Sequence, residues 1–262
     1  MNPRVRAELV DHSVTIGGHF YWRSCTIMVS ISRSSTHCKR EAQAGGMDRS
    51  SPRYPLPAAS ALAARSLHDS VRAVVQALPQ APSHDLALAR DRLSWIVGRD
   101  VTRLDETEIL RASAETAAEN AVDGLFAPLF WMLIGSGLWS LNPALPGPLA
   151  LAWAFKASST LDSMLGYRHG RLQWLGTAGA RLDDALTWLP CRLLALSLRQ
   201  LGPALRDGAS DPSPNAGVSQ AAYAHAVGLQ LGGVNRYSGI ERAKPLLNPG
   251  GRAADQQGVQ AI

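Results

Sequence analysis

The sequence predicts an all-α fold, specifically a multi-pass integral membrane protein with amphipathic helices and polar loops. Three observations support this prediction. Apolar residues recur at helical spacing, no stretch alternates with the period of two that is typical of a half-buried strand, and residues 124–141 carry no charge. A charge-free segment of this length is near the lower limit for crossing the hydrocarbon core of a bilayer. A soluble bundle of unusually apolar helices is the alternative.

The first 54 residues differ in composition from the rest of the chain. They are rich in Ser, Arg and Thr, show no sustained hydrophobic period, and lack the long apolar core of a signal peptide. We expect residues 1–54 to be a disordered or mis-assigned N-terminal extension, with a functional arm as the alternative. Residues 55–247 are expected to form a helical membrane domain. Residues 248–262 have too few apolar side chains to offset the entropy of ordering, which predicts a flexible tail.

Three helices are expected before the apolar segment. The first is ended by Pro79, and its apolar face consists of Leu67, Val71, Val74, Val75 and Leu78. The second repeats the pattern up to Gly98, with Leu86, Leu93, Ile96 and Val97. The third begins at Asp105, because Asp105 and Glu108 have the spacing of a capping box.

Three later segments are apolar enough to meet a bilayer. Residues 124–141 are long enough to cross it, whereas residues 143–155 are short and interrupted by proline, which is typical of a re-entrant or paired half-helix. Residues 185–198 contain Arg192 and are interpreted as an interfacial or protein-covered helix. Tryptophans near the segment ends are typical of an interfacial belt; they are Trp131, Trp139, Trp153, Trp174 and Trp188.

A stripe of carboxylates precedes the longest apolar segment. Glu115, Glu119 and Asp123 recur every four residues and so lie on one side of a helix. Beside apolar surroundings each carboxylate must be paired, protonated or bound to a cation. One interpretation is a cation site, to which Asn120 adds an amide contact. The other is ion pairing with arginines of neighbouring helices, such as Arg99 or Arg181.

Composition argues against several other functions. The formal net charge is +5, but the basic residues are scattered without interleaved aromatic residues, so no nucleic-acid partner is expected. The three cysteines have neither metal-binding spacing nor an even-numbered disulfide pattern. The chain has no P-loop and no dinucleotide-binding glycine motif, so any nucleotide site is of another design.

Four more polar motifs have both a functional and a structural interpretation. Asp162 suits metal or amine binding, and equally a helix cap or a salt bridge to Lys156. Arg181 and Asp184 share a helix face at i,i+3, which fits a simple ion pair as well as phosphate or metal binding. Residues 213–217 read as a loop in which Asn215 offers both a donor and an acceptor. The glycine pair at 232–233 permits close approach of the backbone to a ligand or to another element.

Several motifs occur together in a fixed order. They are Gly98–Asp100, Glu115-Thr116, Glu119-Asn120, Val122–Gly124, Ala127–Phe130, Thr160–Met164, Gly166-Tyr167, Ala180–Asp184, Ser213–Gly217, Leu231–Gly233, Asn235 and Tyr237. In content and order, over roughly residues 60–247, they resemble the adenosylcobinamide-phosphate synthase family of cobalamin biosynthesis (CobD/CbiB).

The resemblance implies an activity in the inner cell membrane. Members of this multi-pass family join (R)-1-amino-2-propanol phosphate, or ethanolamine phosphate, to a carboxylate of adenosylcobyric acid. Formation of the amide is coupled to hydrolysis of ATP with magnesium. The implied partners are therefore the corrinoid, the amino-alcohol phosphate, the lipid bilayer and other corrin-pathway enzymes.

The site residues that the matching motifs suggest fall into three groups. The expected catalytic residues are Glu115, Glu119, Asp123, Asp162 and Asp184, of which Glu119 and Asp123 are expected to bind the metal. The expected substrate-binding residues are Arg99, Asp100, Asn120, Tyr167, Arg181, Ser213, Asn215, Gly232, Gly233 and Asn235.

The sequence also departs from the family pattern. Gln220 stands where the family has a Glu, which removes a possible base or metal ligand, and residues 1–50 do not resemble the membrane helices with which the family begins. The alternative function is therefore a catalytically impaired membrane protein of the same lineage, acting as an interaction partner or a decayed product. A small-molecule transporter would follow from the apolar helices alone.

Overall fold

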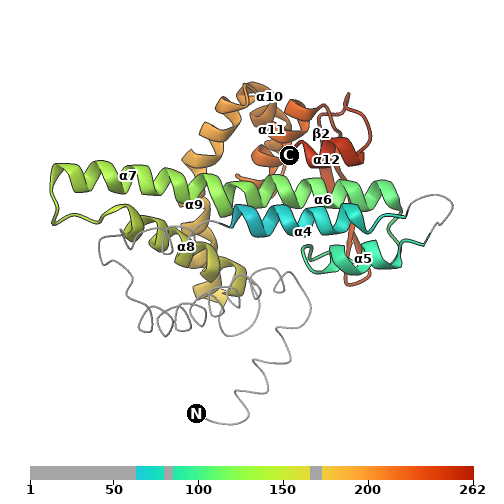
Figure 1. The fold of residues 1–262 in the computed structure, drawn as a ribbon, viewed down its shortest axis with the longest axis horizontal. Helices are drawn as coiled ribbons and strands as arrows, with labels where there is room; N and C mark the ends of the chain where they lie inside the picture. Colours follow the sequence, from blue (N-terminus) through green and yellow to red (C-terminus); the bar gives the residue numbers. More distant parts are fainter. Residues whose placement is uncertain (1–62, 80–84, 166–172) are drawn as a thin grey trace, which may run out of the picture.

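The structure is a computed structural model that describes residues 63–79, 85–165 and 173–262. The predictions for residues 1–54 and for Tyr167 lie outside these described residues. The described part is mostly helical, as predicted, and its longest feature is one continuous helix from Glu106 to Leu141. This helix consists of α6 (Glu106–Ala121), a π-helical turn η1 (Val122–Phe126) and α7 (Ala127–Leu141). Figure 1 shows it running across the molecule, with α7 extending beyond the elements around α6.

Two helices pack against α6, as the amphipathic pattern predicted. Helix α4 (Ala64–Gln76) buries its apolar face, and helix α5 (Ala87–Ser94) lies beside it. The start of α6 has the predicted capping box: the Asp105 carboxylate accepts from Glu108 N at 2.8 Å, and Glu108 Oε2 accepts from Asp105 N at 2.9 Å. Capping of this kind satisfies backbone donors that the first helical turn leaves without partners.

Pro128 explains why the long helix contains a π turn. Proline has no N–H, so the carbonyl four residues earlier, that of Gly124, loses its normal helical donor. Ala63, just before α4, donates its backbone N–H to Gly124 O at 2.7 Å instead. The regular ladder is interrupted next to Asp123, and π turns of this kind frequently occur at functional sites.

A second proline inside a helix is accommodated in the same way. Helix α9 (Gln173–Ser197) contains Pro190, which leaves the carbonyl of Leu186 without a donor. The indole Nε1 of Trp131, on α7, donates to Leu186 O at 3.2 Å. Trp131 therefore joins α7 to α9, whereas the sequence suggested only an interfacial position for it.

Helix α8 (Pro148–Leu165) follows α7 and packs back against it. Gly135 allows the close approach, because a Cβ at this position would lie 2.7 Å from Gly147 O. The outer side of α7 remains apolar and open, with Leu133 71% and Leu141 82% exposed. Residues 106–141 form a helix long and apolar enough to cross a membrane.

The next two helices pack on each other and on helices described above. Helix α10 (Leu201–Gly208) packs on α11 (Ala216–Val227), and α11 also contacts α6 and α9. Gly208 and Gly217 make the α10–α11 contact close, since a Cβ on Gly208 would lie 2.6 Å from the Gly217 carbonyl carbon.

The all-α prediction was wrong at the C-terminal end. Strands β1 (Leu231–Tyr237) and β2 (Ile240–Leu247) form an antiparallel two-stranded sheet. Their sequences do not alternate: Leu231 and Leu247, which pair across the strands, are buried in the core, and polar contacts help to hold the rest of the hairpin in place. The Asp100 carboxylate accepts from Gly239 N at 2.7 Å in the turn, and Arg111 donates to Val234 O at 3.1 Å in β1.

Residues 248–262, for which a flexible tail was predicted, include the short helix α12 (Gln256–Gln260). The Asp255 carboxylate caps it by accepting from Gly258 N at 2.6 Å, and Val259 is buried. The helix packs against α6, and Gly258 lies against Leu229. A few small contacts thus order a segment that is poor in apolar residues.

Candidate functional site

An acidic cavity of about 320 Å³ lies beside the π turn. Five carboxylates line it, contributed by α6, η1, α8 and α9; they are Glu119, Asp123, Asp162, Asp183 and Asp184. Elements far apart in the sequence thus place their negative charges around one space, which we call the acidic cavity.

Helix α9 contributes its side of the cavity through one helical stripe. Its lining residues are Ala180, Asp183, Asp184, Thr187 and Cys191, which follow each other at steps of three, one, three and four. Asp183 and Asp184 lie on either side of this stripe, so both face the cavity. Arg181 lies outside the stripe and is exposed. The predicted shared role of Arg181 and Asp184 is therefore not reflected in a shared position on this cavity.

The loop before α11 forms the opposite wall of the acidic cavity. Asn215 begins α11, and its side-chain Nδ2 donates to Asp184 O at 2.9 Å and to Asp184 Oδ1 at 3.3 Å. Arg192 donates to Asn215 Oδ1 at 2.6 Å and to Pro214 O at 2.8 Å. The Ser213 hydroxyl accepts from the backbone N–H of Ala216 at 3.2 Å. Asn215 thus fastens the loop to α9, and Ser213 lines the cavity.

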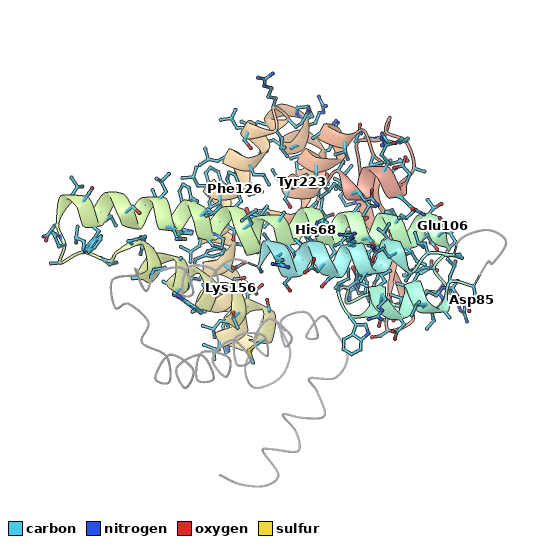
Figure 2. All side chains as sticks on the ribbon, viewed as in Figure 1. His68, Asp85, Glu106, Phe126, Lys156 and Tyr223 are labelled. Atoms are coloured by element: carbon cyan, nitrogen blue, oxygen red, sulfur yellow. The ribbon has the colours of Figure 1, made fainter. Side chains whose placement is uncertain are left out.

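Burial and the neighbouring carboxylates make Asp183 harder to ionise than an ordinary aspartate. Burial, then the charges of Asp162 and Asp184, raise the pKa of Asp183 to about 7. The ammonium of Lys156 opposes this increase. Lys156 is buried on α8 (Figure 2) and so provides positive charge within the protein near the cavity. Near neutral pH, Asp183 therefore exists both protonated and ionised.

Two polar atoms at the acidic cavity have no hydrogen-bond partner in the described part of the chain. They are Asp183 Oδ1 and the Thr187 hydroxyl, both buried. Buried polar atoms are normally satisfied, so these two point to a water, an ion or a substrate group. Within residues 63–79, 85–165 and 173–262, no three His, Cys, Asp or Glu side chains are arranged closely enough to enclose a metal ion alone.

A second cavity of about 280 Å³ shares Glu119 with the first, and we call it the mixed cavity because it carries both charges. Its polar lining residues are Arg99, Glu115, Thr116, Glu119, Asn120, Gln220, Tyr237 and Lys244. Gln220 Nε2 donates to Glu119 Oε2 at 2.9 Å across the shared wall.

Glu115, the first member of the carboxylate stripe, is fully engaged by the protein. It is buried, pairs with the guanidinium of Arg99, and accepts from Arg111 at 3.1 Å and from Gly232 N at 2.9 Å. Arg99 and Arg111 also donate to Asn235 Oδ1, at 2.8 and 3.1 Å. We call these residues the Glu115 network; it ties α6 to β1.

A model of the CobD/Cbib protein family matches residues 16–262. The chain belongs to the CobD/CbiB family. The resemblance found in the motifs is thereby confirmed.

Individual CobD/CbiB proteins are similar over most of this chain. A cobalamin biosynthesis protein CobD of Synechocystis sp. is 47% identical over 200 residues, covering 73% of this chain and 56% of that protein. The CobD proteins of Pelobacter propionicus and Klebsiella pneumoniae are 42% and 43% identical and cover 79% and 71% of this chain. The chain spans 56–63% of the length of these three relatives. No solved structure matches the chain.

The structure separates the family-derived site residues into groups. Those on the acidic cavity are Glu119, Asp123, Asp162, Asp184, Ser213 and Asn215. Those in the Glu115 network are Arg99, Glu115, Gly232 and Asn235. Asn120 lines the mixed cavity and donates to Thr116 O at 2.9 Å, Gly233 lies next to Gly232 in β1, and Asp100 caps the hairpin turn.

Sequence reasoning about this CobD/CbiB chain did not select four residues that line or support the cavities. They are Asp183, Arg192, Gln220 and Lys244. The spacing of Asp183, Thr187 and Cys191 by four residues was a signal for the first, since it marks one face of a helix. Lys244 had no such signal, because its position depends on the hairpin that the sequence did not predict.

Proposed function

We propose that this chain acts in cobalamin biosynthesis, as an ATP- and magnesium-dependent ligase. The reaction would join the amine of (R)-1-amino-2-propanol phosphate, or of ethanolamine phosphate, to a carboxylate of adenosylcobyric acid, giving adenosylcobinamide phosphate. The printed names of the relatives and the ordered family motifs support this proposal. Since the chain spans only part of those relatives, the proposal concerns the cavities that its described residues form.

The convergence of five carboxylates on one cavity is the observation that carries the proposal. Packing like charges together is unfavourable unless a ligand or cation later neutralises them. Phosphoryl transfer is catalysed mainly by positioning and by neutralising the charge on phosphate oxygens. An acidic cavity that holds a cation with a nucleotide phosphate meets both requirements.

The donor chemistry of the acidic cavity fits magnesium. Magnesium prefers oxygen ligands and is usually held by one or two carboxylates together with waters and substrate phosphate. Glu119 and Asp123 would hold it. When bound, magnesium would neutralise phosphate charge.

The protein's own groups would divide the remaining work. Asp183 exchanges a proton near neutral pH, so it can accept the proton that the amine releases when its nitrogen bonds to the acyl carbon, while the phosphate that ATP had placed on that carboxylate leaves with the electrons of the C–O bond. Asn215, held by Arg192, fixes the wall on which Ser213 lies. Lys156 limits the repulsion among the carboxylates before any substrate binds.

The apolar face of α7 supports location in the cell membrane. Leu129, Leu133 and Leu141 are exposed on it, and this face would be covered by lipid. A multi-pass arrangement would add α8, which returns along α7, and the apolar part of α9. We expect the protein to sediment with membranes and to resist high salt, which removes only electrostatically bound proteins. Recovery in the soluble fraction without detergent would instead favour a soluble bundle.

The ligase proposal is tested with purified protein in detergent, adenosylcobyric acid, ethanolamine phosphate, ATP and magnesium. Formation of the amide product and of ADP is expected, and both should stop when magnesium is chelated. Asp123→Asn should abolish product formation while raising the magnesium-free melting temperature slightly, since it relieves a like-charge pair worth about a few tenths of a kcal/mol. Glu106→Gln, on the exposed first turn of α6, is the matched control and should retain activity.

Gln220 is the observation that favours the second candidate, a catalytically impaired member of the lineage. It stands where the family motif has a Glu, and its amide is bound to Glu119. If the native chain forms no product but the Gln220→Glu variant does, the chain is a catalytically impaired member of the lineage. If Gln220→Glu is inactive and the native chain is active, the amide is the working group here.

A further inference from the structure

The mixed cavity contains an acceptor and a cation that the Glu115 network does not use. Gln220 is only 2% exposed, and its Oε1 has no hydrogen-bond partner among the described residues. The orientation of this amide follows from its neighbour: a carboxylate only accepts, so the NH₂ group must face Glu119. Its carbonyl oxygen remains available to a donor from a ligand.

Lys244, on β2, supplies the cation. Its side chain is 25% exposed and its Nζ lies 3.6 Å from Asp211 Oδ2, beyond hydrogen-bond distance. Burial acts to lower the pKa of Lys244, but the carboxylates of Glu119 and Asp211 together raise it above its ordinary value. Lys244 is thus a charged ammonium group on the cavity wall, held by attraction rather than by a direct hydrogen bond.

We propose that the mixed cavity is the subsite for the amine-bearing substrate, a small molecule with a primary ammonium and a phosphate a few atoms apart. This inference rests on the proposed function and deepens it. The ammonium binds Gln220 Oε1 and Glu119, while the phosphate takes Lys244 as its counter-ion. The substrate's ammonium then supplies positive charge beside Glu119, while Lys244 is engaged by the phosphate.

The side chain of Glu119, which both cavities share, determines where the bound amine lies relative to the acidic cavity. Glu119 lines both cavities, so a nitrogen bound to it lies at the boundary with the acidic cavity. The amine and the proposed magnesium–phosphate site are then neighbours, separated by one side chain. Arg99 is occupied by Glu115 and Asn235 and is not needed to bind the phosphate.

Calorimetric titration of the full chain in detergent, without ATP or magnesium, tests the subsite. The probes are ethanolamine phosphate, ethanolamine and inorganic phosphate. Because ethanolamine phosphate makes contacts at both ends of the cavity and each fragment makes only one set, it should bind at least ~10-fold more tightly than either fragment. Lys244→Met should weaken the binding of ethanolamine phosphate by a similar factor and should not weaken the binding of ethanolamine. Gln220→Leu should weaken the binding of both amines and leave the binding of inorganic phosphate unchanged.

Arg242→Gln is the matched control, since it removes an exposed positive charge from the same strand outside the cavity. Equal binding by the parent, Lys244→Met and Arg242→Gln would overturn the assignment, as would a parent that does not bind ethanolamine phosphate. If Lys244→Met fails to fold, Lys244→Arg must retain binding, and its loss would also overturn the assignment.

The subsite and the ligase activity can fail separately. Ligation with an unchanged KM for ethanolamine phosphate in Lys244→Met would refute the subsite and leave the proposed function intact. Lys244-dependent binding in a chain that forms no product would refute the function and leave the subsite intact.

Discussion

The Glu115 network and the acidic cavity belong to one carboxylate stripe but differ completely in their surroundings. Glu115 is enclosed by two arginines, a backbone N–H and a hairpin. Asp123, two turns further along the same helix, faces a cavity with other carboxylates around it. Equal sequence spacing therefore does not imply equal roles, because the partners come from elements far away in the sequence.

The comparison assigns stability to one end of the stripe and chemistry to the other. The sequence left two interpretations open for all three residues, a cation site or arginine pairing. In the structure, Glu115 has the arginine partners, including the Arg99 that was named as a candidate. Glu119 and Asp123 line the acidic cavity, and their proposed metal binding stays a prediction.

The largest effect is expected from breaking the Glu115 network. Glu115→Gln leaves the buried guanidinium groups of Arg99 and Arg111 without a counter-charge, which should destabilise the fold by about 3–5 kcal/mol. Thermal unfolding in detergent measures this. Glu241→Gln is the matched control, because its exposed pair with Arg236 is expected to contribute about 0–1 kcal/mol. Similar losses in both variants would contradict the structural role of Glu115.

The acidic cavity should respond in the opposite way to loss of a charge. Asp183→Asn should lower the rate of amide formation by about 100-fold or more, the range typical of a lost general base, without lowering the melting temperature of the magnesium-free chain. Initial rates and melting curves measure the two effects. Asp91→Asn on exposed α5 should change neither. If Asp183→Asn strongly lowers the melting temperature but leaves the rate of amide formation unchanged, Asp183 has a structural role in this cavity and no catalytic one.

The hairpin side of the Glu115 network is tested at Gly232. Its φ is +83°, and a Cβ there would lie 2.0 Å from Pro245 O in β2. Gly232→Ala should cost about 1–3 kcal/mol for overpacking in addition to the strain at positive φ. Gly239→Ala has a similar φ of +80° and nothing within 4 Å, so only the strain should appear. Equal costs would show that the Gly232 contact relaxes freely.

The last expected effect is a pH dependence that arises from Asp183 in the acidic cavity. The folded-state pKa of Asp183 is raised to about 7 from an ordinary value of 3.8, so the folded chain holds a proton that the unfolded chain has lost between those values. Magnesium-free stability should therefore fall as pH rises from about 4 to about 7. The increase in melting temperature on adding magnesium should grow over pH 6–8 and be absent in Asp183→Asn. A magnesium effect independent of pH would contradict this link.

Periodicity was sufficient where one helix face meets the core. The apolar positions of α4 and the capping box of α6 were both confirmed, since local spacing alone determines them. The hairpin could not be predicted in this way, because its strands do not alternate and polar contacts from Asp100 and Arg111 help to hold them. Family motifs indicated most residues of the acidic cavity, but only the three-dimensional arrangement separates them from the Glu115 network.

The prolines within the two helices bear on the order of assembly. A lone α6–α7 helix leaves the Gly124 carbonyl without a donor, and a lone α9 leaves that of Leu186 without one. In lipid, each unsatisfied carbonyl costs several kcal/mol, since no water replaces the missing donor. Trp131 and the residue before α4 remove this penalty only when the helices come together. If these helices lie in a bilayer, neither is expected to insert as an independent unit. In either setting, the turn that carries Asp123 acquires its final hydrogen bonds only on docking of α4.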